Sequence, residues 1–197
     1  MRNRTAARVL SVSLVAGAAL LGTAAVSPAA ETGPVGLRFV NAGGTFGDPS
    51  SGGNAVTYDK TLVPVGARAH VLAFGSEVTG TQTALVVAGL QPDREYGAHA
   101  HAKPCGATGA VAGPHFQHVP DPVTPSVDPA FANPHNEIWL DFTTNATGIA
   151  FALSSVNWVA TDERAPKSVV IHEMHTRTGA GEAGTAGARL ACIDVDF

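Results

Sequence analysis

The chain has 197 residues, of which 12 are basic and 16 acidic, and it contains only eight histidines and two cysteines. Without the first thirty residues, which hold three arginines and no acid, nine basic residues face 16 acidic ones, a net charge of −7. This balance excludes a broad basic surface for nucleic acid. It also means that an anionic substrate would need a local positive charge to approach.

The first thirty residues, 1–30, have the pattern of an export signal. Arg2, Arg4 and Arg8 form a positive start, an apolar run covers residues 9–26, and small residues occupy positions 27–30. This order is typical of a signal peptide, with cleavage at about residues 27–31. An uncleaved anchor is the alternative, because the run approaches the length of a membrane span. Its glycine and alanine content makes it weakly hydrophobic, so we expect a secreted or cell-envelope protein without a stable membrane span after cleavage.

The rest of the chain is expected to be one all-β domain. Residues 31–63 are interpreted as a leader and a first strand, and residues 64–197 form one domain together with 35–63. Short alternating segments bounded by Gly and Pro predict a sandwich or barrel. Residues 43–54 are expected to be a hairpin loop or an irregular edge, and residues 117–134 and 176–187 to be long loops. The predicted strands are Gly36–Asn41, Arg68–Phe74, Thr81–Ala88, Glu95–His101, Ile138–Thr143, Ile149–Ser154, Asn157–Ala160, Ser168–His172 and Leu190–Val195.

The two cysteines, Cys105 and Cys192, form an even pair in a chain that we expect to be exported. Disulfides form and persist in oxidising compartments. A bond between these two would close a loop worth about 4 to 5 kcal/mol on the chain-entropy model. We therefore expect a disulfide.

Three imidazoles and a thiol lie within seventeen residues, in the sequence from His99 to His115. Side chains alternate along a strand, so His99 and His101 must point to the same face. Neutral imidazole nitrogen suits copper and zinc, and His172 offers a fourth ligand at the end of a β-branched strand. The alternative is that surface histidines recur here by chance.

With these residues the chain resembles the copper/zinc superoxide dismutase family. The matching motifs run in order, as Gly-x-His-x-His at 97–101, Cys105, Gly-Pro-His-Phe at 113–116, Val-Val-Ile-His-Glu at 169–173 and Gly-Ala-Arg-Leu-Ala-Cys at 187–192. The resemblance covers roughly residues 64–197 and implies an eight-stranded Greek-key β-barrel or sandwich. It further implies four copper ligands, an arginine that attracts and orients superoxide, and an intrasubunit disulfide. The implied residues are His99, His101, His115 and His172 for copper, Arg189 for superoxide, and Cys105–Cys192 for the disulfide.

The zinc site of the family is only partly matched. A zinc ion would be held by His115, His118 and His135 with one displaced carboxylate, since Ile138 stands where the family has an aspartate. The family's aspartate four residues after the last copper ligand is also replaced, by Thr176. This pattern is similar to the copper-only branch of the family, in which a carboxylate can hold the otherwise bridging histidine. Glu137 or Asp141 is expected to do this for His115.

The resemblance implies an exported superoxide dismutase that converts superoxide to dioxygen and hydrogen peroxide by copper(II)/copper(I) cycling. The alternative is a copper carrier or buffer on the same fold, without turnover. A carrier needs no anion-steering arginine, so Arg189 favours the enzyme. A homodimer is possible, because family dimers differ in the face they use. The two tryptophans, Trp139 and Trp158, are interpreted as core or barrel-surface aromatics outside any site.

Overall fold

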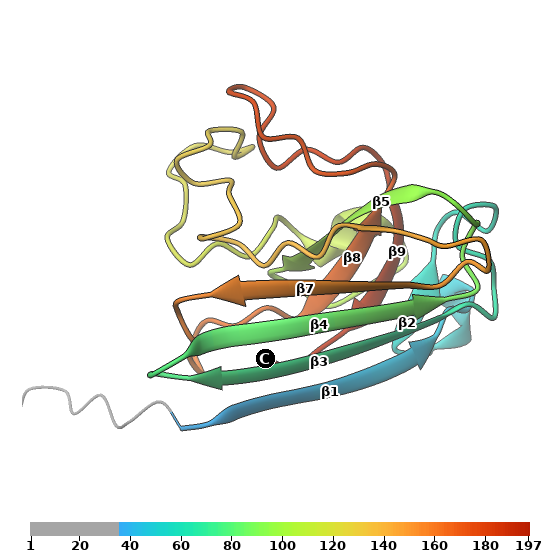
Figure 1. The fold of residues 1–197 in the computed structure, drawn as a ribbon, viewed down its shortest axis with the longest axis horizontal. Coiled ribbons are helices and arrows are strands. Elements are labelled where there is room, and N and C mark those ends of the chain that lie inside the picture. The colour runs from blue at the N-terminus through green and yellow to red at the C-terminus, as the bar shows by residue number, and fades with distance from the viewer. Residues whose placement is uncertain (1–35) are drawn as a thin grey trace, which may run out of the picture. The chain divides into compact units, whose positions relative to one another are not determined.

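A computed structural model describes residues 36–197 of the protein. The predicted signal peptide (1–30) and the first residues of the predicted leader lie outside this part. Within it the chain forms strands joined by loops and two short 3₁₀ helices, η1 (Pro49–Ser51) and η2 (Gly109–Ala112) (Figure 1). The strands are β1 (Arg38–Thr45), β2 (Ala55–Thr57), β3 (Arg68–Ser76), β4 (Gly80–Ala88), β5 (Glu95–His101), β6 (Phe142–Thr143), β7 (Ala150–Val156), β8 (Ser168–His172) and β9 (Arg189–Asp194).

These strands make two antiparallel sheets. One has four strands in the order β1-β3-β4-β7, and the other has five in the order β2-β9-β8-β5-β6. The prediction of an all-β fold is confirmed, in the form of a two-sheet sandwich. The described residues form nine strands where the resemblance implies eight, and two of the nine, β2 and β6, are only three and two residues long.

Two local predictions were wrong. The segment 138–143 is a strand only at its last two residues, Phe142 and Thr143. Before them it runs beside β5 with separate bonds, from Ala100 N–H to the Ile138 carbonyl at 3.1 Å and from Leu140 N–H to the Ala98 carbonyl at 2.7 Å. Residues 157–160 form no strand. β1 extends to Thr45, and the rest of the segment predicted as a hairpin loop or irregular edge, 46–54, contains η1 and no strand. In each case tertiary contacts decide the local backbone.

The core lies between the two sheets. Side chains of β3 and β7 alternate strictly between exposed and buried positions, as expected for sheets with one covered face. On β5 the small residues Ala98 and Ala100 belong to this core cluster. Their neighbours His99 and His101 therefore project from the opposite face of the five-stranded sheet. That face is covered by loops, because β5 is buried on both sides over residues 96–101.

The predicted disulfide is present. Cys105 and Cys192 are bonded across a sequence separation of 87 residues. The bond ties the segment after β5 to the centre of β9, and the Cys105 N–H also donates to the Asp194 carboxylate at 2.7 Å. The loop that leads from β5 to His115 is thereby fixed to the sheet at both ends.

Candidate metal centre

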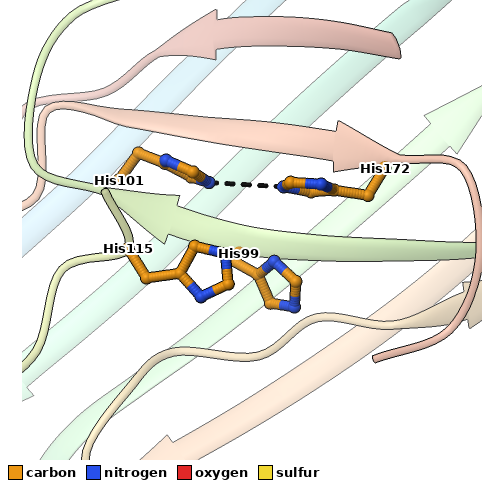
Figure 2. Close-up of side chains that lie close together, drawn as sticks. All are labelled: His99, His101, His115 and His172. Carbon is orange, nitrogen blue, oxygen red and sulfur yellow. Dashed lines mark hydrogen bonds between the residues drawn. The ribbon is translucent and has the colours of Figure 1, made fainter. Parts of the chain in front are cut away.

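Three separate segments bring the predicted copper ligands together. His99 and His101 come from β5, and His172 ends the neighbouring strand β8, where it lies opposite Gly97. His115 follows η2 and is paired with His101 through an isolated β-bridge. One ligand nitrogen from each of these four histidines lies within 4.8 Å of the other three. Figure 2 shows the four rings facing a common centre.

Glycine at position 97 lets the 173–188 loop pack directly against β5. A Cβ at this position would lie 2.5 Å from the Met174 carbonyl oxygen and 2.8 Å from the Ala186 side chain. The segments before and after the tip of the 173–188 loop therefore cross β5 in direct contact with its backbone. Any side chain larger than hydrogen would push the loop away from the histidines, which accounts for glycine at the start of Gly-x-His-x-His.

Hydrogen bonds to other residues determine which ring nitrogen of His101 and of His115 keeps a lone pair for a metal. His101 Nδ1 donates to the Gly113 carbonyl at 3.0 Å, and its Nε2 lies 3.3 Å from His172 Nε2. His115 Nδ1 donates to the Glu137 carboxylate at 2.7 Å. Each bond fixes the tautomer and the orientation of its ring. The nitrogen left with a lone pair is Nε2 on both residues.

The hydrogen bond of His99 uses the other ring nitrogen, Nε2. Its Nε2 lies 2.5 Å from the Thr176 hydroxyl, which itself donates to Asp141 at 2.7 Å. Because the hydroxyl proton is used toward Asp141, the Thr176 oxygen accepts from His99 Nε2–H. His99 Nδ1 is then a buried lone pair without a hydrogen-bond partner. A buried acceptor of this kind is costly unless something binds it, so the residues fit a metal ion.

The environment favours the neutral form of His99, His101 and His172. Burial, followed by the neighbouring imidazoles, holds the pKa of His99 and the pKa of His101 well below the usual value. Burial and the charges of His115 and Arg189 lower the pKa of His172 to about 3. Neutral imidazole offers its lone pair at pH 7, which is the form that binds metals.

The structure distinguishes the two carboxylates proposed to hold His115. Glu137 contacts it, whereas Asp141 supports His99 through Thr176 and lies 3.8 Å from His99 Nε2. Glu137 is 1% exposed. It also accepts bonds from Trp139 Nε1 at 2.7 Å and from Gln117 Nε2 at 2.8 Å.

The interpretation of Trp139 as a residue outside the site was therefore wrong. Its indole N–H shares Glu137 Oε2 with His115, and its ring lies 5.8 Å from that of His99, centroid to centroid. The sequence carries a signal for this role in the spacing Glu137-x-Trp139. Two side chains separated by one residue of an extended segment share a face.

Arg189 lies at the opening above the histidines. It begins β9, is half-buried, and donates from Nη1 to the Gly109 carbonyl at 2.8 Å. A Cβ on Gly109 would lie 2.6 Å from the Arg189 Cβ, so glycine there lets the side chain pass. Burial lowers the pKa of Arg189, but a guanidinium remains charged at neutral pH. His115, His172 and Arg189 line one open pocket of 1310 Å³.

Neither protein-family models nor curated protein sequences match this chain. Solved structures do. A Cu/Zn superoxide dismutase from Brucella abortus aligns over 82% of this chain and 100% of its own length, with a TM-score of 0.54 and 16% identity. The chain has the fold of the copper/zinc superoxide dismutases. Two mutant forms of a superoxide dismutase-like protein from Bacillus subtilis align over 79% of this chain and 97% of theirs, with TM-scores of 0.52 and 0.53 and 15% identity.

The superoxide dismutase fold does not bring the predicted zinc histidines to His115. His118 is exposed and stacks on Trp158, with ring centroids 5.1 Å apart. His135 is also exposed, and its carbonyl accepts from Trp158 Nε1 at 2.9 Å. In residues 36–197 the group of donors close enough to share a metal ion consists of the four histidines described above. No helix in that range is both long and apolar enough to cross a membrane.

Proposed function

We propose that this protein is an exported superoxide dismutase that holds one copper ion per chain. The observation that carries the proposal is the group of four imidazoles, each with one nitrogen within 4.8 Å of the others, beside a pocket that also contains Arg189. The donor atoms would be Nδ1 of His99 and Nε2 of His101, His115 and His172. Four imidazoles suit copper in both of its common oxidation states.

The chemistry that copper would supply when bound is a one-electron couple, through which one superoxide is oxidised to dioxygen and a second, taking up one electron and two protons from water, is reduced to hydrogen peroxide. The chain's own residues set the conditions for it. His115 Nδ1–H donates to the Glu137 carboxylate at 2.7 Å, so this nitrogen is occupied by a hydrogen bond and leaves Nε2 for the metal. The buried ligands on β5 leave the pocket side of the centre, lined by His115 and His172, for substrate.

Arg189 would bring superoxide to the pocket. A chain with a net charge of −7 after residue 30 repels an anion at long range. A fixed positive group in a partly buried position raises the local concentration of the anion and stabilises it when bound. The hydrogen bond to Gly109 uses Nη1 and leaves other guanidinium donors for the ligand.

We further propose that zinc is not a partner of this site. A bridging histidine must offer both ring nitrogens to metals, but Glu137 already accepts the proton of His115 Nδ1. His118 and His135 contact Trp158 instead. The expected metal content is therefore one copper and no tightly bound zinc.

A copper carrier or buffer on the same fold is the second candidate. Thr176 stands in place of the aspartate that the dismutase family has, and the Bacillus subtilis neighbours are described only as superoxide dismutase-like. A carrier would need the histidines but not Arg189. The two candidates therefore differ in what Arg189 does.

The test is the rate of superoxide decay measured with purified, copper-loaded protein. We expect activity in the unaltered chain and a rate constant at least about tenfold lower for Arg189→Ala at unchanged copper content. His101→Ala should lose copper as well as activity. Arg177→Ala is the matched control, because Arg177 is an exposed arginine paired with Glu182. A fully copper-loaded protein without activity would refute the enzyme and leave the carrier, and metal analysis of the same sample measures zinc.

A further inference from the structure

The pocket beside the histidines is far larger than superoxide requires. Its volume is 1310 Å³, whereas one water molecule takes up about 30 Å³ and a diatomic anion is of the same order. Pockets that hold organic ligands measure about 300–1,000 Å³. We call the part that extends away from Arg189 the loop pocket. Its lining includes Ala102, Pro114, Phe116, Val123, Val127 and Ala165.

The loop pocket has an apolar floor and an apolar outer wall. Phe116 and Ala165 on the floor belong to the hydrophobic core cluster and are buried apart from the little surface that meets the pocket. Val123 in the outer wall is 65% exposed. An apolar body placed between floor and wall would remove both surfaces from water, which is favourable in proportion to the area covered. The lining therefore favours a ligand that is mostly apolar.

The long loop that forms the outer wall is held in place by its own polar groups. The Asp121 carboxylate accepts from the Val123 N–H and from the Ser126 hydroxyl, both at 2.8 Å. The Gly181 N–H donates to the Val127 carbonyl at 3.1 Å, which joins this loop to the other long loop. A wall that is ordered before binding loses little conformational entropy when a ligand arrives, so the loop pocket is preorganised.

Two of the three cationic side chains along the pocket are already paired within the chain. Arg164 donates from Nη2 to the Gln117 carbonyl at 2.8 Å. Lys167 Nζ lies 2.8 Å from the Asp196 carboxylate. Arg189 uses Nη1 for a backbone carbonyl and keeps its remaining guanidinium donors. An anionic group on the ligand therefore has its partner at the Arg189 end of the pocket.

The carboxylates along the pocket limit the ligand to one negative charge. Asp121 and Glu137 accept hydrogen bonds from the chain, and Asp162 pairs with Arg38. Glu163 is exposed to solvent at the rim. A second anionic group on the ligand would lie among these four carboxylates, at the end of the pocket where the cations are already paired.

We propose that the loop pocket binds a monocarboxylate with a bulky apolar body. The carboxylate accepts from Arg189, whose planar guanidinium matches it, and the apolar body lies between Phe116 and Val123. This ligand is a second one beside the superoxide of the proposed function, and the inference does not depend on that function. A bound ligand stands in the approach to His115 and His172, because both line the same pocket.

The test is calorimetric titration of the copper-loaded and the copper-free chain with naphthalene-2-carboxylate and with acetate, which has the carboxylate but no bulky body. We expect the naphthalene acid to bind at least about 30-fold more tightly than acetate in both forms, because it buries about 100 Å² more apolar surface. Val123→Asp should remove most of this difference, since it places a carboxylate against the rings. Val119→Asp is the matched control, because Val119 is 54% exposed in the same loop and does not line the pocket.

Three results would overturn the inference. One is a naphthalene acid that binds no more tightly than acetate, and another is an equal effect of Val123→Asp and Val119→Asp. The third is binding by the copper-loaded chain alone, because the metal rather than the loop pocket would then hold the ligand. Near-ultraviolet circular dichroism of each variant checks that the fold is intact. Binding by a copper-loaded chain that does not accelerate superoxide decay would refute the proposed function and leave this inference standing.

Discussion

Replacing Glu137 with glutamine tests how the candidate site is held. Three donors converge on this buried carboxylate, from His115 and Trp139 to Oε2 and from Gln117 to Oε1. A glutamine side chain has the same shape but offers one oxygen and one NH₂ group. If its oxygen faces His115 and Trp139, its NH₂ group points at the Gln117 amide, and two donors meet.

The expected effects follow from these bonds. Hydrogen bonds to a charged group are worth about 1.5–3 kcal/mol each, and a buried donor left unpaired costs about 1–3 kcal/mol. Glu137→Gln weakens two such bonds and breaks the third, so we expect the free energy of unfolding of the copper-free protein to fall by about 2–4 kcal/mol. Residues that orient a metal ligand typically change metal affinity by about 10–100-fold. Copper affinity should therefore fall within that range.

Urea unfolding of the copper-free protein and copper competition against a chelator measure the two effects. Electron paramagnetic resonance of the copper(II) form shows whether His115 still coordinates. Glu182→Gln is the matched control, because Glu182 is exposed and pairs with Arg177 away from the histidines. If Glu137→Gln leaves stability, copper affinity and spectrum as they are in the control, the carboxylate does not hold the site and the reasoning fails.

Three further predictions concern the remaining supports of the site. Thr176→Val removes the hydroxyl between His99 Nε2 and Asp141, so copper affinity should fall by about tenfold, whereas Thr176→Ser should retain it. The free energy of unfolding of the copper-free protein should fall as the pH falls from about 6.5 toward 3. In this range His172 is protonated in the unfolded chain but not in the folded one, where its pKa is lowered to about 3. The slope should reach about 1.4 kcal/mol per pH unit for each such histidine. A urea series at several pH values that gives constant stability would contradict this. Cys105→Ala together with Cys192→Ala opens a loop of 87 residues and should cost about 4 to 5 kcal/mol in the same assay.

The parts of the fold that sequence patterns predicted are those with local causes. β3, β4, β5 and β8 were expected to within two residues. β3 and β4 show side chains that alternate between the two faces, and β8 is rich in β-branched residues. The common face of His99 and His101 follows from the same period of two. The convergence of His115 and His172 on that pair came from the family resemblance, since nothing local places either residue next to β5.

The residues that hydrogen-bond to the histidines lie on or beside long loops and were harder to predict. Glu137 and Trp139 follow the loop 117–134, whose path is set by contacts such as the Asn136 amide with the carbonyls of Val119 and Phe131. Treating residues 138–143 as one strand hid the bend that turns Glu137 toward His115. Thr176 was noted only as the residue that stands where the family has an aspartate. The role of its hydroxyl, which links His99 to Asp141, depends on the contact between the segments that carry Thr176 and Asp141 and could not be predicted from either segment alone.

These supports together favour a centre for one metal. The N–H of His101 donates to a backbone carbonyl, that of His99 to the Thr176 hydroxyl, and that of His115 to Glu137. Each acceptor comes from a different segment, so every one of these three rings presents a single nitrogen to the centre. A second metal that shares His115 would have to displace a carboxylate that Gln117 and Trp139 also hold. In the proposed copper site the buried Glu137 carboxylate therefore orients His115, and no second ion is needed to hold that ring in place.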